Sequence, residues 1–102
     1  MGETAKGEIR VHTSGRGLMQ VQVHPRVKKY LDECQDKTRL KEGLARLEED
    51  PFTSRSGLDI KRLKGKTHEV YRLRIGEHRF EYFVEDGIVW VQNAFRRERG
   101  YH

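Results

Sequence analysis

Residues 71–82, Tyr-Arg-Leu-Arg-Ile-Gly-Glu-His-Arg-Phe-Glu-Tyr, constrain the fold of this chain more than any other segment. Apolar residues alternate with charged ones on both sides of Gly76-Glu77, a pattern that predicts two antiparallel strands joined by a two-residue turn. With that turn, Arg74 lies directly opposite Arg79 on one face of the strand pair, and the apolar residues lie on the other face. Like charges opposed across two strands are destabilising. We therefore expect the arginine-bearing face to serve phosphate binding or phosphate chemistry.

The positive charge of the chain is concentrated around the same segment. The formal net charge is +5, and residues 61–79 alone carry seven Lys or Arg against two Glu. The rest is nearly balanced, with eleven against ten before this segment and three against four after it. A concentrated basic patch is typical of a nucleic-acid partner, and a solvated strand face is the plain alternative. The residues that we predict to bind RNA are Lys61, Lys64, Lys66, Arg96 and Arg99.

The length of 102 residues predicts one domain. Residues 1–18 contain four glycines, so we expect a flexible extension, or at most an added hairpin through Ile9 and Val11, before a single domain over residues 19–102. The single cysteine, Cys34, excludes an internal disulfide and fits a reducing cytoplasm. The chain has no apolar run of membrane-spanning length and no recognisable signal peptide. We expect a soluble, cytoplasmic protein.

The first half of that domain predicts one strand and two helices. Residues 19–23 alternate as a short first strand, and Pro25 suits the first turn of a helix whose apolar stripe runs to Cys34. Asp36 is expected to cap a second helix, which ends before Pro51 because a proline disfavours helical geometry in the residue before it. Very few residues join the two helices, which favours an antiparallel helical hairpin.

The second half predicts an antiparallel β-meander. A strand near residues 58–63 precedes the hairpin of residues 71–82, and Asp86-Gly87 is a strong two-residue turn signal that leads into a last strand. The predicted core face carries Tyr71, Leu73, Ile75, Phe80, Tyr82, Val84, Val89 and Val91. The predicted outer face carries Arg72, Arg74, Arg79, Glu81 and Gln92, with Phe83 and Trp90 paired at its far end. The predicted fold class is α+β, with a short first strand, an antiparallel helical hairpin and a meander packed on the helices.

Four runs of the chain, together with the two expected helices, match the pattern of a known superfamily. The runs are residues 59–65 (DIKRLKG), 71–76 (YRLRIG), 79–82 (RFEY) and 96–101 (RRERGY). They resemble the RelE/ParE superfamily of bacterial and archaeal toxins of toxin–antitoxin pairs. The resemblance covers roughly residues 19–102 and implies a RelE-like fold.

The resemblance also implies an activity. RelE-like members are ribosome-dependent endoribonucleases that cut mRNA in the decoding site by attack of the 2′-hydroxyl on the adjacent phosphate, without metal or cofactor. It implies that Arg72 and Arg74 are the two basic residues of the family's third strand, and that Arg79 is the phosphate-stabilising arginine. The arginine after the last strand is then Arg97, and the tyrosine that stacks on a base falls near Tyr101. No histidine in the chain shows metal-ligand spacing.

The general base is not fixed by the resemblance. Several RelE-like members have lysines where Arg72 and Arg74 stand, and an arginine stays protonated at ordinary pH, so it cannot accept a proton. His102 is the best candidate because an unperturbed histidine titrates at about 6.5, and the ending Tyr101-His102 resembles the His-Tyr ending of the YoeB branch. The other candidates are Glu81, Lys64, Lys66 and the terminal carboxylate.

Two of the arginines differ in their expected surroundings. Arg72 faces Glu81 across the predicted hairpin, so a surface ion pair of little consequence is an alternative to a direct role. Arg74 is expected to lack an acidic neighbour, which favours a direct role. Cys34 continues an apolar helical stripe and is expected to be a buried small hydrophobe.

The resemblance implies two partners, a ribosome with its mRNA and a cognate antitoxin that wraps the toxin in a hetero-oligomer. An acidic antitoxin over residues 61–79 would inhibit the toxin by masking that surface. Two other functions stay open at this point. The chain could be a ParE-like inhibitor of DNA gyrase, or a non-catalytic module that binds RNA or the ribosome in a salt-dependent way.

Overall fold

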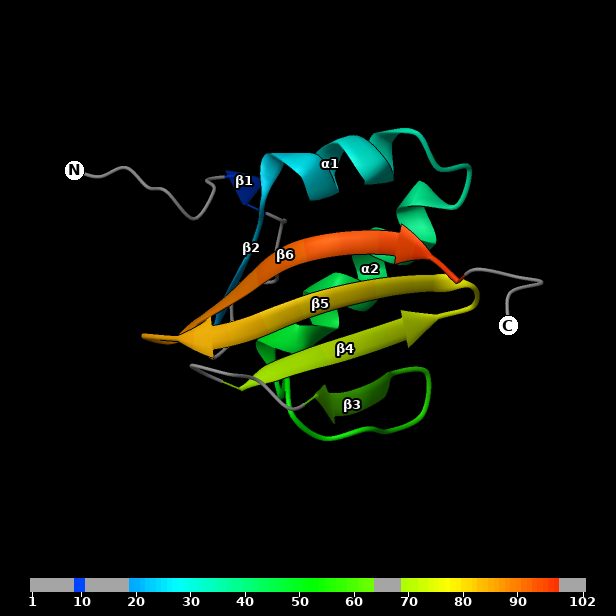
Figure 1. The fold of residues 1–102 in the computed structure, drawn as a ribbon. Coiled ribbons are helices and arrows are strands. Elements are labelled where there is room, and N and C mark those ends of the chain that lie inside the picture. The colour runs from blue at the N-terminus through cyan, green and yellow to red at the C-terminus, as the bar shows by residue number, and fades with distance from the viewer. Residues whose placement is uncertain (1–8, 11–18, 64–68, 98–102) are drawn as a thin grey trace.

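The computed structural model, which describes residues 9–10, 19–63 and 69–97, has one six-stranded sheet with helices on one side of it (Figure 1). The strands are β1 (Ile9–Arg10), β2 (Gln20–Val23), β3 (Asp59–Leu63), β4 (Val70–Ile75), β5 (His78–Glu85) and β6 (Ile88–Arg96). The helical elements between β2 and β3 are α1 (Pro25–Asp32), α2 (Lys37–Ala45) and the 3-10 turn η1 (Arg46–Glu48). The predicted α+β fold is confirmed.

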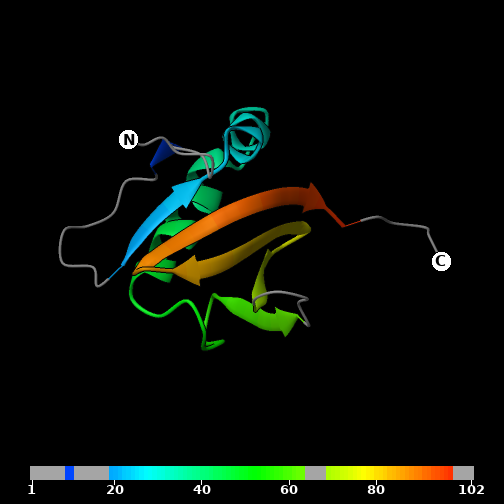
Figure 2. The same cartoon turned by 60° about the vertical axis from the view of Figure 1, so that its left-hand side comes forward.

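The sheet order is β1-β2-β6-β5-β4-β3. Strand β2 runs parallel to β6, and every other neighbouring pair is antiparallel. In Figure 1, α1 lies along β6 and α2 lies behind β5 and β4, and Figure 2 shows both helices on the same side of the curved sheet. The other side of β3–β6 carries no helix in the described part of the chain, and we call it the helix-free face.

The predicted hairpin register is confirmed. Arg74 lies opposite Arg79, and Ile75 lies opposite His78 across the Gly76-Glu77 turn. Gly76 has a φ of +59°, which suits the first position of a type II′ turn. At the next hairpin Asp86 and Gly87 have φ values of 56° and 73°, the positive pair that a type I′ turn requires. Turn chemistry therefore sets the register of both hairpins.

The extension before the first predicted strand contributes one short element. Ile9 of β1 pairs with Val23 of β2, and Arg10 pairs with Gln22. Ile9 therefore belongs to a β1–β2 pair, while Val11, the other residue of the hairpin expected for the extension, lies outside the described residues.

The two helices begin where the sequence predicts. His24 precedes α1, and its Nδ1 atom accepts a hydrogen bond from the Arg26 backbone N–H at 3.1 Å, while Pro25 fills the first helical position. Asp36 occupies the residue before α2, but its carboxylate makes no capping hydrogen bond there. Asp36 therefore occupies the predicted cap position without the side-chain hydrogen bond that a cap usually makes. Its carboxylate lies 3.4 Å from Arg39 Nη1 instead.

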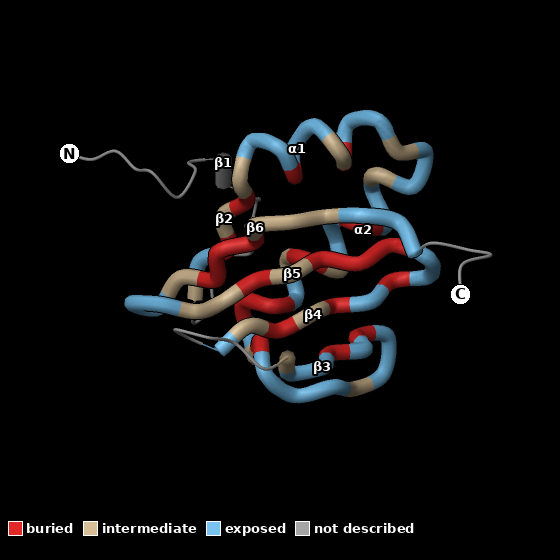
Figure 3. Tube along the Cα trace, in the orientation of Figure 1, coloured by how far each residue is buried: buried red, intermediate tan, exposed pale blue. Residues whose placement is uncertain are grey.

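The core lies between the sheet and the helices, where Figure 3 shows the buried stretches of β4 and β5. The predicted core face is confirmed: Val84 is half-buried and the other seven residues are buried. Tyr82 is fully buried, and its hydroxyl donates a 2.6 Å hydrogen bond to the Pro51 carbonyl oxygen. A Cβ atom on Gly43 would lie 2.5 Å from Ile75 Cδ1, so the glycine permits the close approach of α2 to β4.

A β-bulge interrupts the pairing of β5 with β6. Tyr82 lies opposite Val91, but Glu81 lies opposite Asn93, so Gln92 is the extra residue. The regular register would have placed Gln92 opposite Glu81. Beyond the bulge every side chain of β6 changes face relative to that register, because alternation along a strand has period two.

Candidate functional site

Cationic side chains gather on the helix-free face. Two cross-strand rows define the arrangement: Asp59, Arg74, Arg79 and Phe95 in one, and Lys61, Arg72, Glu81 and Asn93 in the other. Arg97 follows β6, two residues after Phe95 of the first row. We call the surface formed by Lys61, Arg72, Arg74, Arg79 and Arg97 the arginine face.

Arg74 has an acidic partner that the sequence did not reveal. Strand β3 pairs Asp59 with Arg74, and the Asp59 Oδ2 atom lies 2.6 Å from Arg74 Nη2. Both side chains are about half exposed. The expectation that Arg74 lacks an acidic neighbour is wrong, because it considered only the hairpin and not the register of β3.

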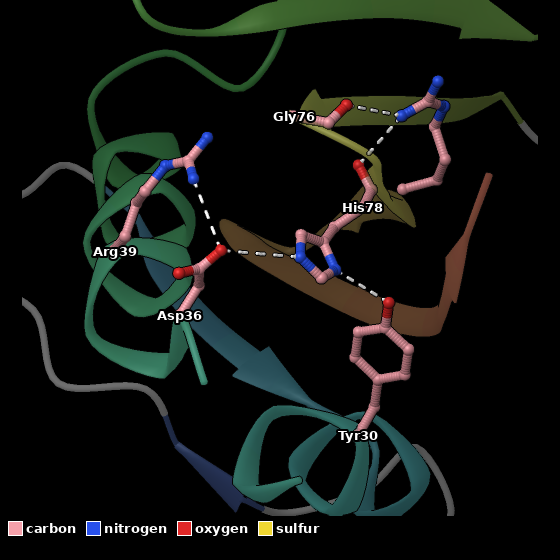
Figure 4. Close-up of polar contacts among 6 residues, drawn as sticks. Tyr30, Asp36, Arg39, Gly76 and His78 are labelled. Carbon is pink, nitrogen blue, oxygen red and sulfur yellow. Dashed lines mark hydrogen bonds and ion pairs between the residues drawn. The ribbon is translucent and has the colours of Figure 1, made fainter. Parts of the chain in front are cut away.

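Arg79 is anchored to the turn that precedes it. Its Nη1 group donates to the carbonyl oxygens of Gly76 at 3.0 Å and His78 at 3.3 Å (Figure 4). The residue is only 8% exposed. Burial, and then the positive charges of Arg74, Arg97 and Arg72, lower the pKa of the Arg79 guanidinium. An arginine shifted in this way still stays charged near neutral pH.

The opposed pair of Arg74 and Arg79 is accommodated within the chain. Asp59 offsets the charge of Arg74, and two backbone carbonyl dipoles receive the Arg79 guanidinium. The like-charge opposition alone therefore does not require an external anion. What favours an anion is the number of cations that converge, since Arg72 and Arg97 also lie close enough to depress the pKa of Arg79.

Arg72 lies opposite Glu81 as predicted, with Lys61 on its other side. Among the described residues no ion pair joins Arg72 to Glu81. The Glu81 Oε1 atom instead accepts a 3.3 Å hydrogen bond from Asn93 Nδ2. The alternative of an Arg72–Glu81 ion pair therefore does not hold, and Arg72 keeps its guanidinium for another partner.

The bulge brings Phe95 and Arg97 to the arginine face. Phe95 lies opposite Arg79 and is 38% exposed, and the Arg97 backbone N–H bonds the Glu77 carbonyl oxygen at 2.7 Å. Without the extra residue at Gln92 both side chains would point to the helix side. The sequence patterns did not predict a role for Phe95. The one feature that could have indicated it is the position of this aromatic residue directly before Arg96 and Arg97.

Arg96 lies on the opposite face from Arg97. It pairs with His78, a core-facing residue, and lines a cavity of about 340 Å³ together with His78, Tyr30 and Cys34. Of the two predicted RNA-binding residues that the structure describes, Lys61 therefore lies on the arginine face and Arg96 does not.

His78 is a second residue that sequence reasoning passed over. It is 5% exposed, and its Nδ1 atom lies 2.8 Å from the Tyr30 hydroxyl (Figure 4). Burial, and then the charge of Arg96, lower the pKa of His78, while Asp36 at 3.9 Å opposes that shift. Burial also raises the pKa values of Tyr30 and Cys34. His78 is thus neutral near pH 7 and ties the start of β5 to α1.

Cys34 is a free thiol that packs against the core, as expected. It is only partly buried, however, and not fully buried as predicted.

Five predicted site residues, Lys64, Lys66, Arg99, Tyr101 and His102, lie outside the described residues. Within the ranges that are described, no group of three or more His, Cys, Asp or Glu side chains is arranged to hold a metal ion. No helix in these ranges is long and apolar enough to cross a membrane.

Two known proteins resemble this chain over most of its length. "Putative toxin RelE1" of Methanocaldococcus jannaschii is 39% identical over 85 residues, which cover 79% of this chain and 92% of that protein. The fold is similar to that of a chain in the crystal structure of the archaeal RelE–RelB complex from Pyrococcus horikoshii OT3, with a TM-score of 0.70 and 27% identity. That superposition covers 81% of this chain and 99% of the other. No established family profile matches the chain.

Proposed function

The chain belongs to the RelE family of toxins, and from that membership we propose that it is the toxin of a toxin–antitoxin system that cleaves mRNA on the ribosome. The observation that carries the proposal is the convergence of Arg72, Arg74, Arg79 and Arg97 on one helix-free face. Guanidinium groups match phosphate oxygens in geometry and charge. A set of them on a rigid sheet is suited to hold a phosphate as its charge increases during cleavage.

In the proposed reaction the 2′-hydroxyl oxygen of one nucleotide attacks the adjacent phosphorus. The bond from phosphorus to the 5′-oxygen of the next nucleotide breaks, which leaves a 2′,3′-cyclic phosphate and a 5′-hydroxyl. Arg79 stabilises the extra negative charge, because the turn carbonyls hold its guanidinium in place before RNA arrives. Arg72, Arg74 and Arg97 hold the flanking phosphate oxygens.

The reaction needs a base for the 2′-hydroxyl proton and an acid for the leaving oxygen. None of the four arginines can accept a proton. We propose His102 as the base, as expected from the sequence, with Glu81 as the alternative carboxylate on the described part of the face. The pH–rate profile separates them, because His102→Ala would remove a limb at about pH 6.5 that Glu81→Gln would leave in place.

Phe95 is suited to stack on a base of the bound strand. It is exposed, lies in the same row as Arg79 and presents an aromatic ring to the arginine face. Stacking on aromatic side chains is a common way of holding single-stranded RNA. Tyr101 is proposed to assist in the same role.

The proposed partners are the translating ribosome and an acidic antitoxin, with the toxin domain over residues 19–102 acting in the cytoplasm. The similar archaeal RelE was solved together with RelB. An antitoxin segment rich in Asp and Glu would neutralise the arginine face, and it would compete with mRNA for the same side chains. Inhibition then occurs by masking.

Primer extension on a reporter mRNA, after induction of the chain in cells, tests the proposal. A matched reporter with its start codon removed is the control. The proposal predicts cuts within the translated frame of the first reporter and intact RNA from the second. Growth arrest with both RNAs intact would contradict it, and would favour a gyrase inhibitor.

A further inference from the structure

A cavity of about 690 Å³ lies at the end of the sheet, next to the arginine face. Its walls are α2, the loop of residues 54–58, and the ends of β3 and β4. We call it the terminal cavity. Four arginines line it, namely Arg39, Arg46, Arg55 and Arg74, against two carboxylates, Glu42 and Asp59, so its lining carries a formal charge of +2.

Two of these arginines serve to build the walls. Arg55 donates to the carbonyl oxygens of Asp50, Thr53 and Arg46, at 2.9, 2.6 and 3.3 Å, and so fastens the loop to the end of the helical segment. Arg74 binds Asp59 at 2.6 Å. Their charges are therefore already compensated by groups of the chain itself.

The guanidinium groups of the other two arginines, Arg39 and Arg46, have fewer partners among the described residues. In the part of the chain that the structure describes, the Arg39 guanidinium has only the exposed Asp36 carboxylate as an ion-pair partner, at 3.4 Å. Within the described ranges the Arg46 guanidinium makes no hydrogen bond or ion pair. Both side chains lie against glycine turns, since a Cβ atom on Gly76 would be 3.1 Å from Arg39 Nη2, and one on Gly57 would be 2.9 Å from Arg46 Nη1.

We propose that the terminal cavity binds a phosphate group of an RNA strand that also crosses the arginine face. The identity of the ligand as RNA rests on the proposed function. Arg74 lies in both sites, so a strand held at Arg79 and Arg74 continues directly into the cavity. Arg39 and Arg46 bind the phosphate oxygens there.

Phosphate fits the cavity better than a single carboxylate does. A phosphodiester presents more acceptor oxygens than a carboxylate, and so satisfies guanidinium groups that approach from two sides. The volume also leaves room for the attached sugar, with the apolar side chains of Leu58 and Ile75 in the lining.

Binding of a 2′-O-methyl oligoribonucleotide, measured by fluorescence anisotropy over a range of salt concentrations, tests this site. The oligonucleotide cannot be cleaved, because its 2′-oxygens are blocked. The variants are Arg39→Gln, Arg46→Gln and the double variant. The control is Lys41→Gln, which removes an exposed cation from the same helix outside the cavity lining.

Each lost phosphate contact lowers the slope of log K against log salt by about 0.7 for a single strand. We expect the double variant to bind more weakly and with a reduced slope, and Lys41→Gln to stay close to the parent chain. The amide resonances of Gly57 and Gly76 should also shift when the oligonucleotide is added to the parent chain. Unchanged melting temperatures would show that the exposed substitutions leave the fold intact.

A double variant whose affinity and slope equal those of Lys41→Gln would overturn the inference. So would variants that bind the oligonucleotide normally but lose affinity for an acidic peptide, since the cavity would then be a protein site. Cleavage plays no part in this readout. A chain that never cuts mRNA but shows the slope loss would keep the cavity assignment and reject only the nuclease proposal.

Discussion

The Asp59 carboxylate lies 2.6 Å from the Arg74 guanidinium across the β3–β4 pair, so one cation of the arginine face is partly neutralised by its own sheet. In the proposed function, RNA competes with this carboxylate for Arg74, so we expect the ion pair to lower RNA affinity. Its exposed position means that it adds little stability.

Asp59→Asn should tighten binding of a non-cleavable oligoribonucleotide and steepen the salt dependence, because Arg74 becomes available to a phosphate. The free energy of unfolding should change by less than about 1 kcal/mol, as for other exposed pairs. Asp32→Asn is the matched control, since Asp32 forms an exposed ion pair with Lys28 on α1. Equal effects of the two substitutions on RNA affinity would show that only net charge matters.

Arg97 and Arg96 are adjacent in the sequence but lie on opposite faces of the sheet. Arg97→Ala should lower the cleavage rate on programmed ribosomes by on the order of 10²-fold, the usual loss for a charge-stabilising donor. Arg96→Ala should leave the rate close to that of the parent chain. Similar losses in both variants would contradict the assignment of faces that follows from the bulge at Gln92.

Phe95→Ala should weaken RNA binding by about 1–3 kcal/mol, the range measured for loss of one stacked base. Phe95→Tyr should retain the affinity, because it keeps the ring. Phe52→Ala removes the other large exposed aromatic of the described residues, which packs on Tyr71 at a ring distance of 5.3 Å, and provides the control. The stacking role fails if Phe52→Ala and Phe95→Ala weaken binding equally.

His78 should make the fold less stable in mild acid. Its pKa is lowered in the folded chain, so the unfolded chain binds more protons as the pH falls through about 6.5. The contribution of His78 to the free energy of unfolding is therefore complete above about pH 6.5 and decreases as the pH falls towards the lower folded-state pKa. In urea unfolding at pH 5–8, the stability difference between the parent chain and His78→Gln should narrow as the pH decreases.

A difference that stays constant over this pH range would show that His78 does not titrate differently in the two states. Tyr30→Phe gives a separate check of the contact, since loss of one hydrogen bond typically costs about 1 kcal/mol. That cost should change over the pH range in which His78 becomes protonated, because the Tyr30 hydroxyl lies 2.8 Å from its Nδ1 atom.

The register of the arginine hairpin was predictable because the signals agreed. Gly76 permits the positive φ of the turn, and strict alternation on both sides admits only one register with a buried face. The same reasoning placed Asp86 and Gly87 correctly. Local turn chemistry therefore predicted the cross-strand position of each arginine in β4 and β5.

Other parts of the site depend on contacts between segments that are distant in sequence. The pairing of Asp59 with Arg74 requires the register of β3, and the contact of Tyr30 with His78 requires the packing of α1. The bulge at Gln92 has no glycine or proline to indicate it. These features were therefore not predictable from periodicity, although they decide which cations remain available.

Arg79 is the central residue of the proposed catalytic surface, and the carbonyl oxygens of Gly76 and His78 hold its guanidinium in place. The most direct test is the single-turnover rate of mRNA cleavage on purified programmed ribosomes, with Arg79→Gln and Arg79→Lys compared with the parent chain. Circular dichroism would establish that both variants are folded. We expect Arg79→Gln to cleave about 10²–10³-fold more slowly and Arg79→Lys to recover part of that loss. A folded Arg79→Gln variant that cuts at the parent rate would contradict the assignment of the arginine face as the catalytic surface.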